Sequence, residues 1–181
     1  YGIEPNLDAF EICQIKSDIH NIPKDKFING YAEDLPFEEN TFDFIYCYTV
    51  LEHVNDVEKS IDEMIRVAKK GGYIYINAPD YRQFTERHYK VHLPMFLPRW
   101  INEFLLRLQR RPVNFLSSLQ LINKNQLKKI FDSKNVHANF YAKKAKLNFK
   151  LLLKSPLHIF YYLTYKIFDI SDMQEWIVKK N

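Results

Sequence analysis

The sequence has little glycine and little cysteine, with four glycines and two cysteines among 181 residues. Cys13 and Cys47 lie within apolar patterns and lack metal-ligand spacing, which argues against a cysteine metal cluster or a disulfide scaffold. No apolar run reaches 18 residues, so no segment is expected to span a membrane. We therefore expect buried free thiols in a reducing, cytoplasmic protein.

Basic residues are scarce in the first 80 positions, which carry 7 Lys and Arg against 16 Asp and Glu, a net charge of −9. Residues 81–181 carry 19 against 6, a net charge of +13. Opposite charges suggest different ligands: a cationic one for the acidic half and an anionic or phosphate-bearing one for the basic half. Drift in surface composition is the alternative explanation.

The length and composition, 46% hydrophobic and 27% charged, predict one folded domain. Strand and helix patterns alternate, which favours an α/β sheet with right-handed connections. Residues 80–98 show no clear helix or strand periodicity, which predicts a long functional loop or lid. The predicted helices cover residues 8–15, 56–70, 99–110 and 123–132, and the predicted strands cover 26–29, 42–48, 73–78, 136–141 and 173–180.

The most informative stretch runs from Phe42 to Pro79 and predicts a β-α-β unit. Its first strand leads into a loop that carries Glu52 and His53, and its helix has acidic residues early and basic residues late. Gly71 and Gly72 are expected to end that helix with a left-handed turn. In open α/β sheets ligands bind at the carboxyl ends of the strands, so the loop is a candidate site.

Four motifs occur in order: Gly2-Ile-Glu4, Gly30-Tyr-Ala-Glu-Asp-Leu-Pro-Phe37, Leu51-Glu-His-Val54 and Gly71-Gly72. Together they resemble class I S-adenosylmethionine-dependent methyltransferases, in particular the branch that includes the ubiquinone-biosynthesis enzymes. The resemblance covers residues 1–80. It implies a Rossmann-like, doubly wound, mostly parallel sheet with helical additions, and a methyltransferase that uses S-adenosylmethionine.

The resemblance also implies how the chain is divided. Within a single domain, residues 1–80 would be the cofactor-binding half, and residues 81–181 the lid and acceptor-binding half. A doubly wound nucleotide fold normally opens with a strand and a glycine-rich turn before the position of Gly2. We therefore expect an amino-terminally truncated methyltransferase domain that binds the cofactor weakly by itself.

Several residues are candidates for cofactor binding. Glu4 ends a predicted strand, where a carboxylate can accept hydrogen bonds from both ribose hydroxyls, although a dehydrogenase would use an acid there too. The resemblance implies that the loop after Gly30 surrounds the adenine, and that the end of the next strand faces the methionine part. These two segments supply Tyr31, Ala32, Glu33, Asp34, Cys47 and Tyr48.

His53 is the candidate catalytic base, because its unperturbed pKa suits proton transfer from an acceptor hydroxyl. Its alternative role is to cap or orient the loop. His92 is a weaker candidate, and it lies four residues after His88 with no acid or cysteine expected nearby. Related O-methyltransferases that use a metal have acids just before the Glu-His pair, where this chain has Tyr48 and Thr49, so no metal is expected.

Two other functions remain open from the sequence, a nicotinamide-dependent oxidoreductase and a non-catalytic nucleotide-binding fragment. The expected partner is a small acceptor, anionic or linked to a lipid or nucleotide, with Arg82, Arg87, Lys90 and Arg99 steering it. The aromatic segment at residues 156–168 is either core or a contact with a membrane surface. Nucleic-acid binding, for which residues 140–146 have a suitable composition, is the least favoured partner.

Overall fold

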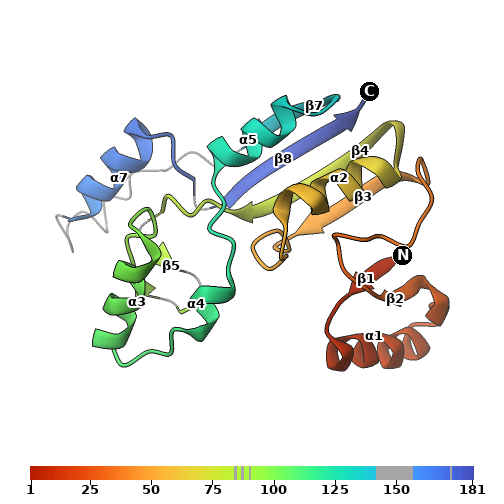
Figure 1. Ribbon diagram of the computed structural model, residues 1–181, viewed down its shortest axis with the longest axis horizontal. Coiled ribbons are helices and arrows are strands. Elements are labelled where there is room, and N and C mark those ends of the chain that lie inside the picture. Colours follow the sequence, from red (N-terminus) through yellow and green to blue (C-terminus); the bar gives the residue numbers. More distant parts are fainter. Residues whose placement is uncertain (84, 87, 90, 142–156, 172) are drawn as a thin grey trace.

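The computed structural model describes residues 1–83, 85–86, 88–89, 91–141, 157–171 and 173–181. Its main sheet has the strand order β3-β4-β8-β7 (Figure 1). These strands are β3 (Phe42–Tyr48), β4 (Ala68–Pro79), β8 (Met173–Lys180) and β7 (Val136–Tyr141). β3 and β4 are parallel, whereas β8 is antiparallel to both neighbours. The α/β class is confirmed, and the antiparallel placement of β8 is a feature that the sequence did not predict.

One face of this sheet forms the core. Side chains alternate across a strand, and the inward set includes Ile74, Ile76, Trp176 and Val178, all nearly inaccessible to solvent. Helices α2 (Val57–Val67) and α5 (Lys124–Asp132) pack on this face (Figure 1). The other face carries exposed aromatic side chains, namely Phe44, Tyr46, Tyr48 and Tyr73.

A separate parallel pair, β1 (Gly2–Glu4) and β2 (Phe27–Asn29), lies at the amino-terminal end. It is connected by α1 (Leu7–Ile19) and the short 3-10 helix η1 (Lys24–Lys26). The Asn6 side chain caps α1 by accepting a hydrogen bond from the Ala9 amide at 2.9 Å. This β-α-β unit places the end of β1 near the loop that follows β2, because the Gly30 amide donates to the Glu4 carbonyl.

The helix predicted for residues 56–70 begins as expected but ends early. Asp56 caps it, and its side chain accepts from the Lys59 amide at 3.0 Å. The helix ends at Val67, and β4 starts at the next residue. The two glycines therefore lie inside β4, at an irregularity in its pairing with β3, so their predicted role as a helix stop is wrong. Gly71 does adopt a left-handed φ of 77°.

The carboxyl-terminal half adds short elements around the end of β4. These are the hairpin β5 (Thr85–Glu86) and β6 (Val91–His92), and the helices α3 (Arg99–Leu108), α4 (Asn114–Ser118) and α7 (Leu157–Ile167). The side chains of Trp100, Phe104 and Leu108 on α3 are exposed. In the described part of the chain, no helix combines the length and the apolar character that crossing a bilayer requires.

Candidate functional site

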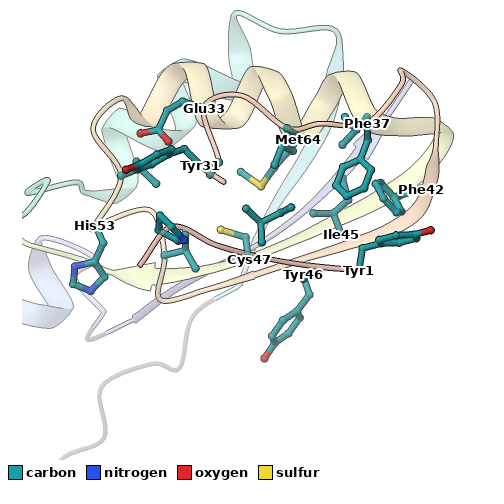
Figure 2. Close-up of a pocket in the computed structure, with 18 of the residues that line it drawn as sticks. Tyr1, Tyr31, Glu33, Phe37, Phe42, Ile45, Tyr46, Cys47, His53 and Met64 are labelled. Atoms are coloured by element: carbon teal, nitrogen blue, oxygen red, sulfur yellow. The ribbon is translucent and has the colours of Figure 1, made fainter. Parts of the chain in front are cut away.

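A cavity of about 630 Å³ opens between the amino-terminal strand pair and the main sheet (Figure 2). Its walls come from β1, the loop after β2, strand β3, the loop that follows β3, and the underside of α2. Tyr1, Phe37 and Phe42 pack edge to face at one end, with ring centroids 4.8–5.9 Å apart. His53 lies at the opposite end (Figure 2).

The loop that follows β2 is fixed to α2 by hydrogen bonds. The Arg66 guanidinium donates to the carbonyl oxygens of Leu35 at 2.9 Å and Phe37 at 2.7 Å. The Glu63 carboxylate accepts from the Leu35 amide at 2.8 Å and also pairs with Arg66. The pKa of Glu63 is lowered, first by its hydrogen bond with Arg66. The cavity wall is therefore held in place before any ligand binds.

Five predicted site residues line the cavity: Tyr31, Ala32, Glu33, Cys47 and His53. The Glu33 side chain is nearly buried, and its Oε1 accepts from the amides of Asn55 at 2.6 Å and Asp56 at 3.2 Å. It therefore also fixes the loop before α2. The Tyr31 side chain is exposed by 57%, so its ring is accessible to a ligand.

The other predicted residues lie outside this lining. Glu4 ends β1, but its side chain accepts a hydrogen bond from the Asn6 amide at 2.9 Å. Asp34 is exposed, and Tyr48 stacks on Tyr46 with ring centroids 5.8 Å apart. His92 is in β6, with its backbone paired to Thr85. Cofactor contacts by these residues stay predictions.

Cys47 forms part of the apolar wall. Burial, followed by the nearby charge of Glu52, raises the pKa of its thiol to about 12. Since the thiolate is the reactive form, this cysteine is a packing residue at neutral pH.

A polar cluster adjoins the cavity at the His53 end. One ligand atom each from Glu52, His53 and His88 lies within 4.8 Å of the others. His88 Nδ1 is 2.7 Å from Glu86 Oε1, and the imidazole rings of His53 and His88 are 5.3 Å apart. The expectation that His88 has no acid nearby is therefore wrong. Glu86 lies only two residues before His88 and was overlooked, whereas Glu52 comes near His88 only through the fold.

The protonation of this cluster follows from burial. Burial raises the pKa of Glu52, whereas burial and then the charge of His88 lower the pKa of His53. Both shifts favour the neutral form of each group. A neutral imidazole is the form that accepts a proton or binds a cation.

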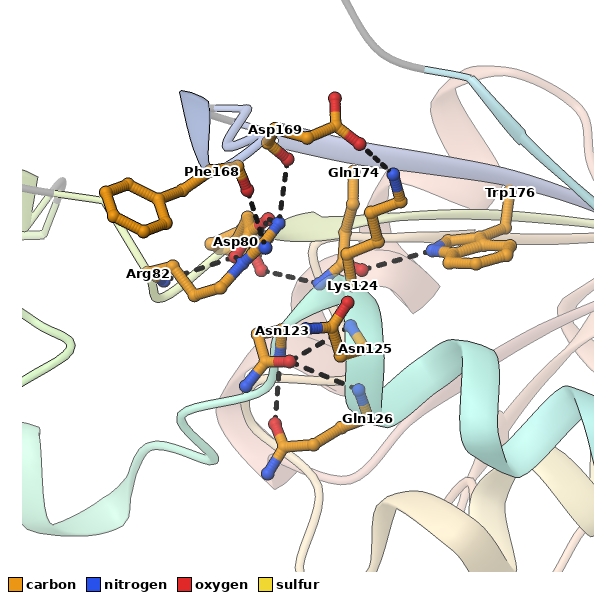
Figure 3. Close-up of polar contacts among 11 residues, drawn as sticks. Asp80, Arg82, Asn123, Lys124, Asn125, Gln126, Phe168, Asp169, Gln174 and Trp176 are labelled. Carbon is orange, nitrogen blue, oxygen red and sulfur yellow. Dashed lines mark hydrogen bonds and ion pairs between the residues drawn. The ribbon is translucent and has the colours of Figure 1, made fainter. Parts of the chain in front are cut away.

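Two of the cations predicted to steer an acceptor have structural partners instead. Arg82 pairs with Asp80 and donates to the carbonyl oxygens of Phe168 and Asp169 (Figure 3). Arg99 donates to the carbonyl oxygens of Leu116, Ser117 and Leu119. The other two, Arg87 and Lys90, lie outside the described residues.

Comparison with known proteins agrees with the resemblance that the motifs indicated. Residues 1–76 match the model of a methyltransferase domain family. The chain is 30% identical over 102 residues to demethylmenaquinone methyltransferase of Staphylococcus saprophyticus, with 52% of this chain and 42% of that protein covered. The corresponding enzyme of Listeria welshimeri is 31% identical over 87 residues, which cover 45% of this chain and 36% of that protein. The chain thus spans less than half the length of these relatives.

Solved structures share the fold at low sequence identity. The YcgJ protein of Bacillus subtilis superposes with a TM-score of 0.60 at 15% identity, covering 99% of this chain and 82% of that one. A Thermotoga maritima methyltransferase, described as a possible histamine N-methyltransferase, has a TM-score of 0.58 at 16% identity, with 99% and 72% covered. The resemblance to S-adenosylmethionine-dependent methyltransferases and the Rossmann-like fold are confirmed.

Proposed function

We propose that this chain, whose residues 1–76 match a methyltransferase domain, holds S-adenosylmethionine in the cavity beside β3 and presents a small acceptor next to His53. The observation that supports this most is the position of the cavity. The cavity runs along β3 from Phe42 to Cys47, and at its His53 end it reaches the carboxyl end of β3 and the matched motifs. That edge is where an open α/β sheet binds its ligands.

The residues present fit the adenosine part of that cofactor. A cavity of about 630 Å³ is within the usual range for small-molecule sites, which are mostly apolar with a few placed polar groups. Ala32, Ile45 and Met64 provide apolar walls, and the accessible ring of Tyr31 can stack on a base. When bound, S-adenosylmethionine supplies a methyl group on a positively charged sulfur.

The chain's own contribution to transfer is mainly positioning. The loop held by Arg66 and Glu63 fixes one wall, so the cofactor would be oriented without reordering the site. His53 has a lowered pKa and is neutral near pH 7, so it is suited to accept a proton from an acceptor hydroxyl. We also propose that residues 1–80 bind the cofactor and that residues 81–181 form the lid and bind the acceptor.

The acceptor is proposed to be anionic or linked to a lipid or nucleotide. Support comes from the net charge of +13 over residues 81–181. Since Arg82 and Arg99 bind backbone carbonyls, the exposed Arg110 and Arg111 after α3 are more accessible to an anionic acceptor. Attraction of this kind weakens with salt, because screening acts over about 8–10 Å at physiological ionic strength.

Contact with a membrane surface is proposed through α3 and α7. Large apolar side chains on these helices are exposed, including Trp100, Leu108, Leu163 and Ile167. Such side chains insert into the boundary region of a bilayer. Flotation with anionic vesicles would test this, with a Trp100→Glu/Leu108→Glu variant as the comparison; recovery of that variant with the vesicles at wild-type levels would contradict it.

The cofactor site can be tested by NMR on protein labelled at its methionine methyl groups. The chain has three methionines, of which Met64 lines the cavity, whereas Met95 and Met173 lie elsewhere. Titration with S-adenosylmethionine should shift the Met64 resonance most and Met173 least, even if affinity is weak. An Ala32→Trp variant, which fills the cavity, should abolish the shift. A response at Met173 alone would contradict the proposed site.

A further inference from the structure

We propose that Glu52, His53 and His88 form a binding site for a divalent transition-metal ion, with Zn²⁺ as the best match. The three side chains come from two segments, the loop after β3 and the hairpin region after β4, and their ligand atoms lie within 4.8 Å of one another. Two imidazoles and one carboxylate are a frequent ligand set for zinc and for other first-row divalent metals.

The first supporting observation is the state of Glu52. Its side chain is only 1% exposed, and Oε2 has no hydrogen-bond partner among the described residues. A buried carboxylate oxygen without a partner is energetically costly, and a bound cation removes that cost. The backbone holds this residue firmly, because the Glu52 carbonyl accepts from the Gln120 amide at 2.8 Å.

The second observation is the partner of His88. Its Nδ1 contacts Glu86 Oε1 at 2.7 Å, while Glu86 Oε2 accepts from the Tyr89 amide at 2.6 Å. Glu86 is itself fully buried. A carboxylate that accepts from one imidazole nitrogen leaves the other nitrogen with a lone pair, which is the usual outer contact of a metal-binding histidine. The chain therefore supplies the ligand and the group that orients it.

The third observation concerns the aromatic side chain that covers the two imidazoles and the distances between the ligand atoms. Phe115 packs against both imidazoles, with ring centroids 4.8 Å from His88 and 6.0 Å from His53. Bonds of about 2.0–2.2 Å to zinc place tetrahedral ligand atoms roughly 3.4 Å apart. Since the ligand atoms lie within 4.8 Å of one another, each distance has to shorten by about 1.4 Å at most. Rotation of the two exposed imidazoles can provide this movement while the buried Glu52 stays fixed.

The site goes beyond the proposed methyl transfer and does not depend on it. A three-ligand site leaves a coordination position open for an oxygen of another molecule. If an acceptor hydroxyl binds there, the metal would lower the pKa of that hydroxyl, and His53, as a ligand, would no longer act as the base proposed above. Metal binding itself is measured without turnover, so failure of one proposal can be told from failure of the other.

The test uses metal-free 181-residue protein, titrated with Co²⁺ and followed by visible absorption, then with Zn²⁺ in competition and with Mg²⁺ as a hard-cation comparison. We expect one equivalent of Co²⁺ with visible bands, displacement by Zn²⁺, and no displacement by equimolar Mg²⁺, which prefers oxygen ligands. Absence of a stoichiometric complex would overturn the proposal and favour a protonated Glu52 in a hydrogen-bonded cluster.

Variants make the assignment specific. His88→Ala changes an exposed side chain and should retain the fold while losing the Co²⁺ bands. Glu86→Gln should weaken Zn²⁺ affinity by about 10–100-fold, as is typical for a residue that orients a ligand. His137→Ala, on the exposed side of β7, is the matched control and should bind like the wild type. Equal binding by His88→Ala and His137→Ala would overturn the site.

Discussion

The Arg66 side chain on α2 donates a hydrogen bond to the carbonyl oxygen of Leu35, 31 positions earlier in the chain, at 2.9 Å. The same guanidinium also binds the Phe37 carbonyl and the Glu63 carboxylate. A planar guanidinium has five donors in a fixed arrangement, so one residue can hold several acceptors at once. This contact connects the helix of the β-α-β unit to the loop that forms the cavity wall.

Replacement of Arg66 by Ala should therefore loosen the loop. Two backbone carbonyls and one carboxylate lose their donor, and we expect a loss of about 1–3 kcal/mol in the free energy of unfolding, measured in urea. Lys69→Ala is the control, because Lys69 forms only an exposed pair with Asp43, worth about 0–1 kcal/mol. Equal effects of the two variants would show that the loop contacts contribute nothing beyond a surface ion pair.

The Glu63 carboxylate should contribute a pH-dependent part of stability. Its pKa is lowered in the folded protein, first by the hydrogen bond from Arg66. Because the pKa of Glu63 is lower in the folded protein than its unfolded value near 4.3, the charged carboxylate stabilises the fold at pH values above about 4.3. This stabilisation is lost as the pH falls through the lower pKa of the folded state. The stability difference between wild type and Glu63→Gln should shrink from pH 6 to pH 2. A constant difference would mean that the Glu63 charge is not the source.

Local patterns predicted much of the sheet. The predicted strand ranges match β3, β7 and β8, and the helix predicted over residues 123–132 matches α5, where Asn123 forms a full capping box with Gln126. These signals lie within a few residues of one another, so the sequence displays them directly. The order of the strands in the sheet depends on contacts between distant segments and was not accessible in the same way.

The site was only partly predictable for the same reason. Cavity residues such as Ala32 and Cys47 were found because the family resemblance marks the loop after Gly30 and the end of the strand that follows. The approach of His88 to Glu52 was missed, since it requires the segment after β4 to lie beside the loop after β3. The contact of His88 with Glu86 is local, two residues apart, and was overlooked. Two acids and two histidines in such loops are the available signal, but their spacing in sequence gives no distance.

Glu33 has two possible roles that mutation can separate. In the structure it accepts from the amides of Asn55 and Asp56. Glu33→Ala should lower the free energy of unfolding by about 1–3 kcal/mol, because two amides lose a charged acceptor. Glu33→Gln keeps a carbonyl acceptor and should lose less. Unchanged stability in both, with weaker S-adenosylmethionine binding, would instead identify Glu33 as a direct contact to the adenine.

Glu4 remains the candidate contact to the ribose. Its carboxylate can bind two hydroxyl groups, so Glu4→Ala should weaken cofactor affinity by about 1–3 kcal/mol. The same carboxylate accepts from the Asn6 amide at the start of α1, so stability must be measured alongside affinity. Isothermal titration on folded wild type and variant gives the comparison. Unchanged affinity would assign Glu4 to capping of the turn alone.

The glycine pair in β4 provides the sharpest structural prediction. A Cβ at Gly72 would lie 2.9 Å from the Lys69 carbonyl oxygen and 3.1 Å from that of Asp43, and neither backbone atom can move without disturbing the β3–β4 pairing. Gly72→Ala should therefore cost more than Gly71→Ala. At Gly71 the space is open, and only the left-handed φ of 77° opposes a side chain, by about 1–2 kcal/mol.

Gly30 is the control for this pair, because a Cβ there meets only Ile3 Cγ2 at an ordinary 3.8 Å. Urea unfolding should rank Gly72→Ala as the least stable variant, Gly71→Ala next, and Gly30→Ala close to wild type. The ranking follows from the placement of both glycines within β4, since a helix stop would make Gly71 the critical position. A larger loss at Gly71 than at Gly72 would restore the helix-stop interpretation and contradict the strand boundary at Ala68.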